Sequence, residues 1–351
     1  MNLNLLTKEN VNIALIGCGR HLTRSLLPNI VAHPKTSVVA AADIIPERLE
    51  AISKKIKGIK TFKSAEDLLE QATELSIDAV VISMDPAGHL KFAEKAIQKD
   101  LHVFVEKPAA FFEEDLRKIG IEAERKNLAT CVGSKWRYTP GTKVLKDWIN
   151  IDSVERDPDL ILLDVTFPKG LTDELWGLNG VQAAFYDIYI HAIDYIFSWL
   201  GNISDIKTDL IKFEKNKQKV VITCKNSDGK TAIASLVRGS AAYQVNFTAH
   251  LNDGTQAILK DLTHLEITPV IPWSNTEGSF RDHPSLQWNP GRLYRGYARA
   301  GYAEEWDSFI ESILSNTTTP TNLIMASSVL GVIERCLHQI GHPLNKNKVG
   351  R

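Results

Sequence analysis

The chain has 351 residues, of which 44% are hydrophobic, and its 41 basic side chains almost balance its 42 acidic ones. This balance excludes a strongly basic nucleic-acid-binding surface, and no apolar run is long enough to span a membrane. The amino terminus lacks a secretory pattern, and four widely separated cysteines suit free thiols in a reducing compartment. We therefore expect a cytoplasmic protein of two domains that binds neither nucleic acid nor a membrane.

Short strands and amphipathic helices alternate in the first third of the chain. Brief runs rich in β-branched residues predict buried strands over residues 11–17, 37–43, 78–83, 102–105 and 128–134. Helical patterns lie between them, over residues 20–32, 46–56, 89–99 and 111–127. This alternation is typical of a Rossmann domain, a doubly wound parallel sheet that binds ligands beyond the carboxyl ends of its strands. We place this domain at residues 1–133.

The pattern changes from residue 134. Longer strands are predicted over 159–167, 219–225, 231–239 and 242–251, and the last of these alternates cleanly between an apolar and a polar face. The segments "NSDG" and "NDG" predict hairpin turns. Helices are predicted over residues 180–201, 302–314 and 321–341. The second domain, residues 134–351, is thus expected to be α/β with a large, mostly antiparallel open sheet.

The segment "LIGCGRHL" follows the first strand and precedes the first helix. Gly17 permits a tight turn, and Gly19 allows a pyrophosphate to approach the backbone amides there, although Leu22 replaces the usual third glycine or small residue. Asp43 ends the second strand, where a carboxylate can accept both hydroxyls of an adenosine ribose and repels a 2′-phosphate. The pattern predicts NAD as the cofactor, with NADP as the other candidate.

The segment "HVFVEKPAA" ends a predicted strand with three residues that do not suit one. Pro108 cannot donate to a strand ladder and restricts the residue before it. The chain must therefore turn there, with Lys107 at the carboxyl end of a strand, where ligands of such sheets bind.

Asp187 and His191 are four residues apart on the predicted helix 180–201, so they share a face. An aspartate can orient a histidine that acts as a general base. A buried histidine with a structural partner is the alternative. A metal site of Asp187, His191 and Asp194 also fits the spacing, but we expect no metal and a structural hydrogen bond for Asp194. Lys135, Trp136 and Arg137 lie near the domain junction and are candidate substrate-binding residues.

Together these motifs resemble the glucose–fructose oxidoreductase/inositol dehydrogenase (Gfo/Idh/MocA) family. The resemblance rests on the glycine turn, the acid after the second strand, "EKP", and D-x-x-x-H on a helix of the second domain. The segments "ISMDPAGH" and "GSKWRYTP" are similar to two further family motifs. Departures include Met84 and Asp85 in the first of these, Asn179 where a glycine pair precedes the helix, and Tyr189 where many members have glycine.

The resemblance implies a catalytic set and two binding sets. Lys107 would donate to the substrate oxygen, while His191 takes the hydroxyl proton and Asp187 holds the imidazole. Cofactor-binding residues would be Gly17, Gly19, Arg20, His21, Asp43, Ser83, His89, Glu106 and Lys107. Substrate-binding residues would be Lys135, Trp136, Arg137, Tyr189 and His191.

The activity implied is that of an NAD(P)-dependent dehydrogenase or reductase. It would transfer a hydride between nicotinamide and a secondary alcohol or ketone of a sugar, a sugar derivative or a cyclic polyol. The alternatives are a redox-neutral NAD-dependent glycosidase or transferase of the same family, and a non-catalytic regulator that senses the cofactor. The family also implies a homodimer or homotetramer formed through the polar face of the second-domain sheet.

Overall fold

The computed structural model describes residues 9–151, 156–170, 173–212, 217–270, 285–291, 296, 298–346 and 349. The chain divides into two compact units. The first comprises Met1–Lys135, Tyr302–Glu334 and Asn345–Arg351, and the second comprises Trp136–Gly301 and Arg335–Leu344. The first boundary lies close to the expected one. The return of residues 302–334 to the first unit is a difference from the continuous division that we expected.

The first unit contains a six-stranded parallel sheet with strand order β3-β2-β1-β4-β5-β6. Its strands are β1 Val11–Ile16, β2 Thr36–Ala42, β3 Lys60–Phe62, β4 Ala79–Ile82, β5 His102–Val105 and β6 Thr130–Val132. Every residue of β4 and β5 is buried, as expected for central strands with helices on both faces. The predicted doubly wound Rossmann sheet is confirmed. Strand β3, a short strand at the edge of the sheet with two exposed residues, was not predicted from the sequence.

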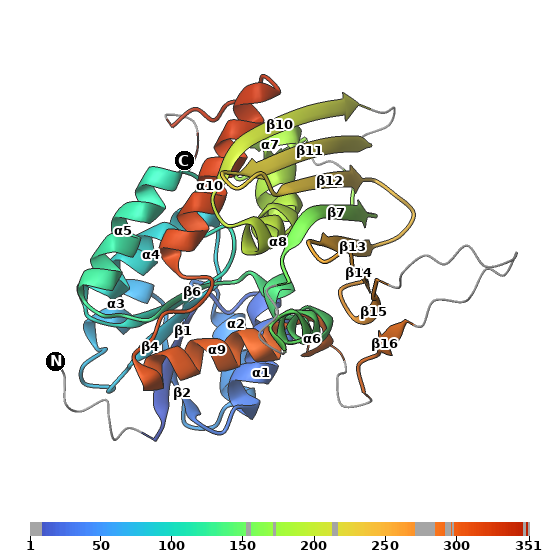
Figure 1. Cartoon of the computed structure of the whole chain (residues 1–351). Helices are drawn as coiled ribbons and strands as arrows, with labels where there is room; N and C mark the ends of the chain where they lie inside the picture. Colours follow the sequence, from blue (N-terminus) through green and yellow to red (C-terminus); the bar gives the residue numbers. More distant parts are fainter. Residues whose placement is uncertain are drawn as a thin grey trace, which may run out of the picture. The chain divides into compact units, whose positions relative to one another are not determined.

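The helices of the first unit pack against this sheet, as Figure 1 shows. They are α1 Leu27–Ala32, α2 Pro46–Lys55, α3 Ala65–Glu70, α4 Pro86–Gln98, α5 Glu113–Arg125 and α9 Tyr302–Ser315, with the first part of α10 Leu323–Gln339. Helix α9 joins this unit because Trp306 and Phe309 pack edge-on against Phe104 of β5, with ring centroids 5.7 and 5.8 Å away. These buried aromatic contacts stabilise the packing of α9 against β5, although the two elements are far apart in the sequence.

The second unit contains an eight-stranded sheet with order β10-β11-β12-β7-β13-β14-β15-β16. Its strands are β7 Pro158–Phe167, β10 Ile203–Lys212, β11 Gln218–Asn226, β12 Thr231–Arg238, β13 Gln244–Leu251, β14 Gln256–Lys260, β15 His264–Thr268 and β16 Leu286–Trp288. Only β7 and β12 pair in parallel, so the predicted mostly antiparallel sheet is confirmed. Four of these strands, β10, β14, β15 and β16, were not predicted.

Helices cover one face of this large sheet (Figure 1). The unit has α6 Pro140–Ile149, α7 Gly180–Ala184 and α8 Ile190–Leu200, short 3₁₀ turns at Lys135–Tyr138 and Ala298–Ala300, and a small hairpin of β8 Glu174–Leu175 and β9 Leu178–Asn179. Buried and more exposed residues alternate along β12 and β13, as they do in a sheet with one covered face.

Two helices contain π-helical turns. The helix after β1 has a π-helical segment, η2 Leu22–Leu26, directly before α1, where Pro28 lacks the amide that a regular α-helix needs. The second segment, η5 Phe185–Tyr189, joins α7 to α8 and contains Asp187. Such turns are frequent at functional sites.

Candidate functional site

The glycine turn after β1 packs closely against the end of β4. Gly17 has a φ of +84°, and a Cβ there would lie 2.3 Å from the carbonyl oxygen of Ser83, so only glycine fits. A Cβ on Gly19 would meet only the Arg48 guanidinium, at 3.9 Å. The backbone at Gly19 is therefore open to a phosphate, as the predicted pyrophosphate site requires. Arg20 and His21 follow at the exposed start of the helix.

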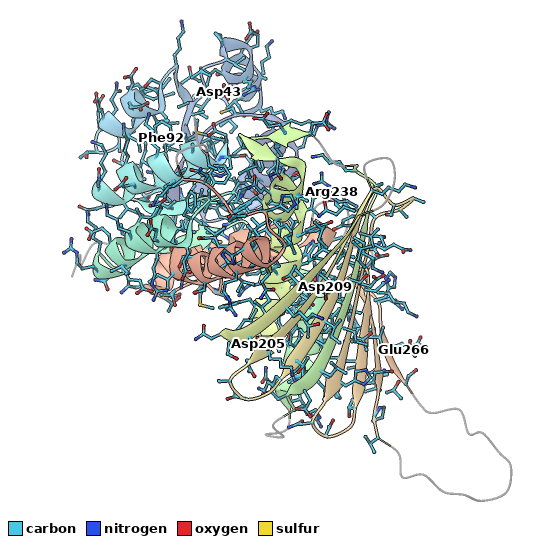
Figure 2. The ribbon with its side chains drawn as sticks, turned by 90° about the horizontal axis from the view of Figure 1, so that it is seen from above. Asp43, Phe92, Asp205, Asp209, Arg238 and Glu266 are labelled. Carbon is cyan, nitrogen blue, oxygen red and sulfur yellow. The ribbon has the colours of Figure 1, made fainter. Side chains whose placement is uncertain are left out.

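Asp43 follows β2 in the first unit, where Figure 2 labels it, and fixes this turn. Its Oδ2 accepts a hydrogen bond from the Cys18 amide at 2.7 Å, and its Oδ1 accepts one from the Ile45 amide at 2.9 Å. Arg48, which the sequence analysis missed, lies with its Nη1 3.4 Å from Asp43 Oδ2. Arginines in this position can accommodate a 2′-phosphate, so Arg48 opposes the selectivity that Asp43 favours.

The Glu106-Lys107-Pro108 corner is held by a buried histidine. The Lys107–Pro108 peptide bond is cis. His89 Nε2 accepts a hydrogen bond from the Met84 amide at 2.8 Å, so its Nδ1 is the donor to the Pro108 carbonyl, at 2.9 Å. Burial lowers the pKa of His89, which keeps the ring neutral. His89 thus joins the chain after β4 to the corner after β5.

Glu106 links this corner to the glycine turn. Its Oε1 lies 2.9 Å from His21 Nε2, and its Oε2 accepts a hydrogen bond from the Lys107 amide at 3.2 Å. Burial alone would raise the pKa of Glu106, but the hydrogen bond and charge of His21, with the charges of Lys107 and Lys135, hold it at about 2. Glu106 is therefore an anion that orders the carboxyl edge of the sheet.

Asp187 in the second unit has two cationic neighbours. Lys169 Nζ donates to Asp187 Oδ2 at 2.9 Å, and Arg238 Nη2 lies 3.7 Å from the same oxygen. Both neighbours favour the ionised carboxylate. The predicted contact between Asp187 and His191 stays a prediction.

His191 begins the regular part of α8 and is buried against an aromatic ring. It stacks on Trp136 with ring centroids 5.4 Å apart and an angle of 25° between the planes. The structure thus brings together two residues that the sequence analysis assigned to the substrate. Tyr189 is also buried in this unit, and its ring packs edge-on against Phe185 at 5.3 Å.

Arg137 forms a buried ion pair with Asp194. Its Nε and Nη2 donate to the two carboxylate oxygens at 2.8 and 2.6 Å, and both side chains are about 5% exposed. The structural hydrogen bond expected of Asp194 is confirmed. This pairing gives Arg137 a structural role, and its predicted contact with the substrate stays a prediction.

Arg238 is a buried residue of this region that the sequence analysis missed. It lies in the large sheet, where Figure 2 labels it, and its side chain is 1% exposed. A sequence pattern could have identified it. Alternation along β12 places Arg238 on the same buried face as Ala232, Ala234 and Leu236, where a charged residue is unusual.

No helix within the described ranges is long and apolar enough to cross a membrane. No group of three or more histidine, cysteine, aspartate or glutamate residues in that part of the chain could hold a metal ion.

The parallel sheet, the open glycine turn and the buried acid after β2 define a dinucleotide-binding unit of the Rossmann class. Residues 11–134 match the model of a family described as an oxidoreductase family with an NAD-binding Rossmann fold. The first unit is therefore similar to this family, and the predicted resemblance to the Gfo/Idh/MocA proteins is confirmed for residues 11–134.

Individual relatives agree with this assignment. Inositol 2-dehydrogenase of Salmonella typhimurium is 31% identical over 213 residues, which are 60% of this chain and 58% of the relative. The match therefore spans less than two thirds of that protein. A dehydrogenase from Chromobacterium violaceum has the same fold, with a TM-score of 0.84 and 22% identity over 94% of this chain and 95% of that one. A 3-ketoreductase from Actinomadura kijaniata, in complex with NADP and TDP-benzene, gives a TM-score of 0.69 and 15% identity over 94% of this chain and 98% of that one.

Proposed function

We propose that the protein is an NAD(P)-dependent oxidoreductase. It transfers a hydride between nicotinamide and a secondary alcohol or ketone of a sugar, a sugar derivative or a cyclic polyol. The observation that carries the proposal is the hydrogen-bonded Glu106-Lys107-Pro108 corner after β5, joined to the glycine turn by the contact between Glu106 and His21. Lys107 follows β5 at the carboxyl edge of the sheet, where we expect the nicotinamide end of a dinucleotide to bind. Relatives named inositol 2-dehydrogenase and dTDP-3,4-didehydro-2,6-dideoxy-alpha-D-glucose 3-reductase support the substrate class.

The cofactor would bind along the carboxyl edge of the first sheet. The open backbone at Gly19 suits the pyrophosphate, and Asp43 lies at the adenosine end. When bound, the nicotinamide supplies the hydride chemistry, and the protein supplies alignment and proton transfer.

In this proposal Lys107, Asp187 and His191 act on one carbinol. Lys107 donates a hydrogen bond to the reacting oxygen and stabilises its developing negative charge. His191 removes the hydroxyl proton during oxidation, because an alkoxide is too basic to form unaided at neutral pH. Asp187 orients the imidazole and stabilises its protonated form.

The assembly and location follow as further parts of the proposal. The polar face of the second-unit sheet includes two exposed apolar residues on paired strands, Leu162 and Ile233, which are 39% and 38% exposed. They favour a homodimer or homotetramer formed through this face. All four cysteines are buried free thiols, which agrees with the expected cytoplasmic location.

The test is cofactor reduction with a substrate panel. The panel contains inositols, free sugars, sugar phosphates and nucleotide sugars, each with NAD and with NADP. We expect turnover with at least one compound. Release of a sugar or transfer of a glycosyl group without net reduction would support the redox-neutral alternative. Tight cofactor binding without any turnover would support the sensor.

A further inference from the structure

Several buried polar atoms lie without partners beneath the covered face of the second-unit sheet. Within the described ranges, Tyr189 Oη, Arg238 Nη1 and both side-chain amide atoms of Gln218 have no hydrogen-bond partner. All three residues are 1% exposed. Native proteins leave few such atoms unpaired, because burial without a hydrogen bond costs free energy. Their accumulation in one region therefore calls for a physical reason.

The fold makes these three residues neighbours. Gln218 and Arg238 stand directly opposite each other on β11 and β12, and both belong to the buried alternation of their strands. The Cβ atoms of two residues in such a cross-strand pair are about 5 Å apart. Tyr189 ends the π-helical segment η5, two residues after Asp187, and Arg238 Nη2 lies 3.7 Å from Asp187 Oδ2. Burial raises the pKa of Tyr189, so the hydroxyl stays protonated.

The free nitrogen of Arg238 is held in place by the rest of its guanidinium. Arg238 Nε donates to the Lys169 carbonyl at 3.3 Å, and Nη2 donates to the Gly170 carbonyl at 3.0 Å. Asp187 Oδ2 lies 3.7 Å from Nη2. These contacts fix the plane of the guanidinium, so Nη1 is a preorganised donor next to the carboxylate of the proposed catalytic set.

We propose that Tyr189, Gln218 and Arg238 form a subsite that binds hydroxyl groups of the sugar or polyol substrate beside Asp187. This inference rests on the proposed function and specifies the part of the substrate that is recognised. Arg238 Nη1 can only donate, whereas the Gln218 amide and the Tyr189 hydroxyl can both donate and accept.

Hydroxyl groups match this set because they also donate and accept. A phosphate or carboxylate only accepts, so it would leave Gln218 Oε1 unpaired and would face the Asp187 carboxylate. Lys169 donates to Asp187 Oδ2, and because its side chain is 51% exposed it is free to exchange this hydrogen bond for one to a ligand.

The test compares two variants with a matched control in the full chain with saturating NAD. Tyr189→Phe and Gln218→Met remove unpaired groups and keep the side-chain size. Tyr195→Phe makes the same substitution on α8, but it removes a buried hydroxyl that is bonded to Thr142 Oγ1 at 2.8 Å. The probes are myo-inositol, D-glucose, glucose 6-phosphate and UDP-N-acetylglucosamine. The readouts are the thermal midpoint of the free protein, the shift of that midpoint by each probe, and KM and kcat.

Each variant has a distinct expected result. Tyr189→Phe and Gln218→Met should not lower the midpoint of the free protein, because they remove groups that have no partner. Each should raise the KM for the best probe about three- to tenfold, as expected for the loss of one hydrogen bond, with a smaller effect on kcat. Tyr195→Phe should lower the midpoint and leave the KM unchanged.

Other results would overturn the subsite. If both subsite variants lower the midpoint of the free protein and leave the KM unchanged, the three groups bind only internal water. Absence of both binding and turnover with every probe would also reject a subsite for sugar hydroxyls. A wild-type protein whose midpoint is shifted by a probe, with the shift reduced in Tyr189→Phe and no turnover, would retain the subsite and reject the proposed function.

Discussion

Lys135 donates a hydrogen bond to the hydroxyl of Tyr302 at 3.0 Å, and this bond joins the residue that ends the first segment of unit one to the first residue of α9. The Lys135 ammonium also lies 4.9 Å from the centre of the Tyr302 ring, and that ring lies 5.9 Å from the ring of His21. The late segment of the chain therefore contributes a side chain to the edge of the sheet where the glycine turn and the Glu-Lys-Pro corner lie.

Lys135 should make the free energy of unfolding depend on pH in the alkaline range. Burial, and then the charge of Lys107, lower its pKa from 10.5 to about 8. Between these two values the unfolded chain binds more protons than the native protein, so this group makes the free energy of unfolding rise with pH. Below pH 8 the cost of the buried charge is fully present. We expect Lys135→Met to remove this rise, measured by urea unfolding from pH 7 to 10. Lys118→Met, at an exposed lysine of α5, should keep the wild-type profile, and a Lys135→Met profile parallel to the wild type would contradict the expectation.

Lys107→Ala and His191→Ala should each lower turnover strongly and leave the affinity for the cofactor almost unchanged. Turnover of the best substrate should fall about a hundredfold or more, because an oxyanion donor or a general base is lost. Calorimetric titration should show NAD(H) affinity within a few-fold of the wild type. Alcohol oxidation by the wild type should rise with pH as a histidine loses its proton, and His191→Ala should lack that rise. Near wild-type oxidation by the His191 variant would show that another group removes the proton.

Asp43 and Arg48 should have opposite effects on the affinity for NADP(H) relative to NAD(H). We expect the wild type to bind NAD(H) more tightly than NADP(H), since the Asp43 carboxylate repels a 2′-phosphate. Asp43→Asn removes that charge and leaves Arg48 available, so NADP(H) affinity should rise about tenfold, or ~1.4 kcal/mol. Adding Arg48→Ala should cancel the gain. Equal or tighter NADP(H) binding by the wild type in the same calorimetric titration would reject the expected preference.

Breaking the buried Arg137–Asp194 ion pair should destabilise the protein strongly. Arg137→Met leaves the Asp194 carboxylate buried without its cation, and the free energy of unfolding should fall by about 3–5 kcal/mol. The control is Arg125→Met, which breaks a pair with Glu122 whose side chains are 67% and 39% exposed, and should cost less than about 1 kcal/mol. Equal effects of the two substitutions in urea unfolding would show that Asp194 finds another partner.

Leu162 and Ile233 should control assembly. If copies of the chain associate through the polar sheet face, Leu162→Glu and Ile233→Glu bury charge in the interface and should give a monomer by light scattering at micromolar concentration. Ile121 is 53% exposed on α5, so Ile121→Glu tests an equally apolar position away from this sheet and should keep the wild-type mass. A wild-type monomer would reject the proposed assembly.

The sequence alone determined those features that depend on local spacing. Alternation of buried strands and amphipathic helices predicted the parallel sheet, because the period of apolar residues is set by the geometry of each element. The turn at Gly17 and Gly19 and the corner at Pro108 were predictable for the same reason, since the conformational limits of glycine and proline belong to the residue itself. Edge strands such as β3 and β16 were missed because they are short and only partly buried, so they have little apolar pattern.

Only the tertiary structure decided which distant residues share an environment. Tyr302 is hydrogen-bonded to Lys135, Arg238 lies beside Asp187, and Gln218 stands opposite Arg238. Strand order and helix packing bring these residues together. The π-helical turn at Asp187 was likewise not predicted from the sequence. The physical reason is that burial and hydrogen bonding act between neighbours in space. The sequence shows that Arg238 is charged and on a buried face, but only the folded chain shows that one of its nitrogens lacks a partner among the described residues.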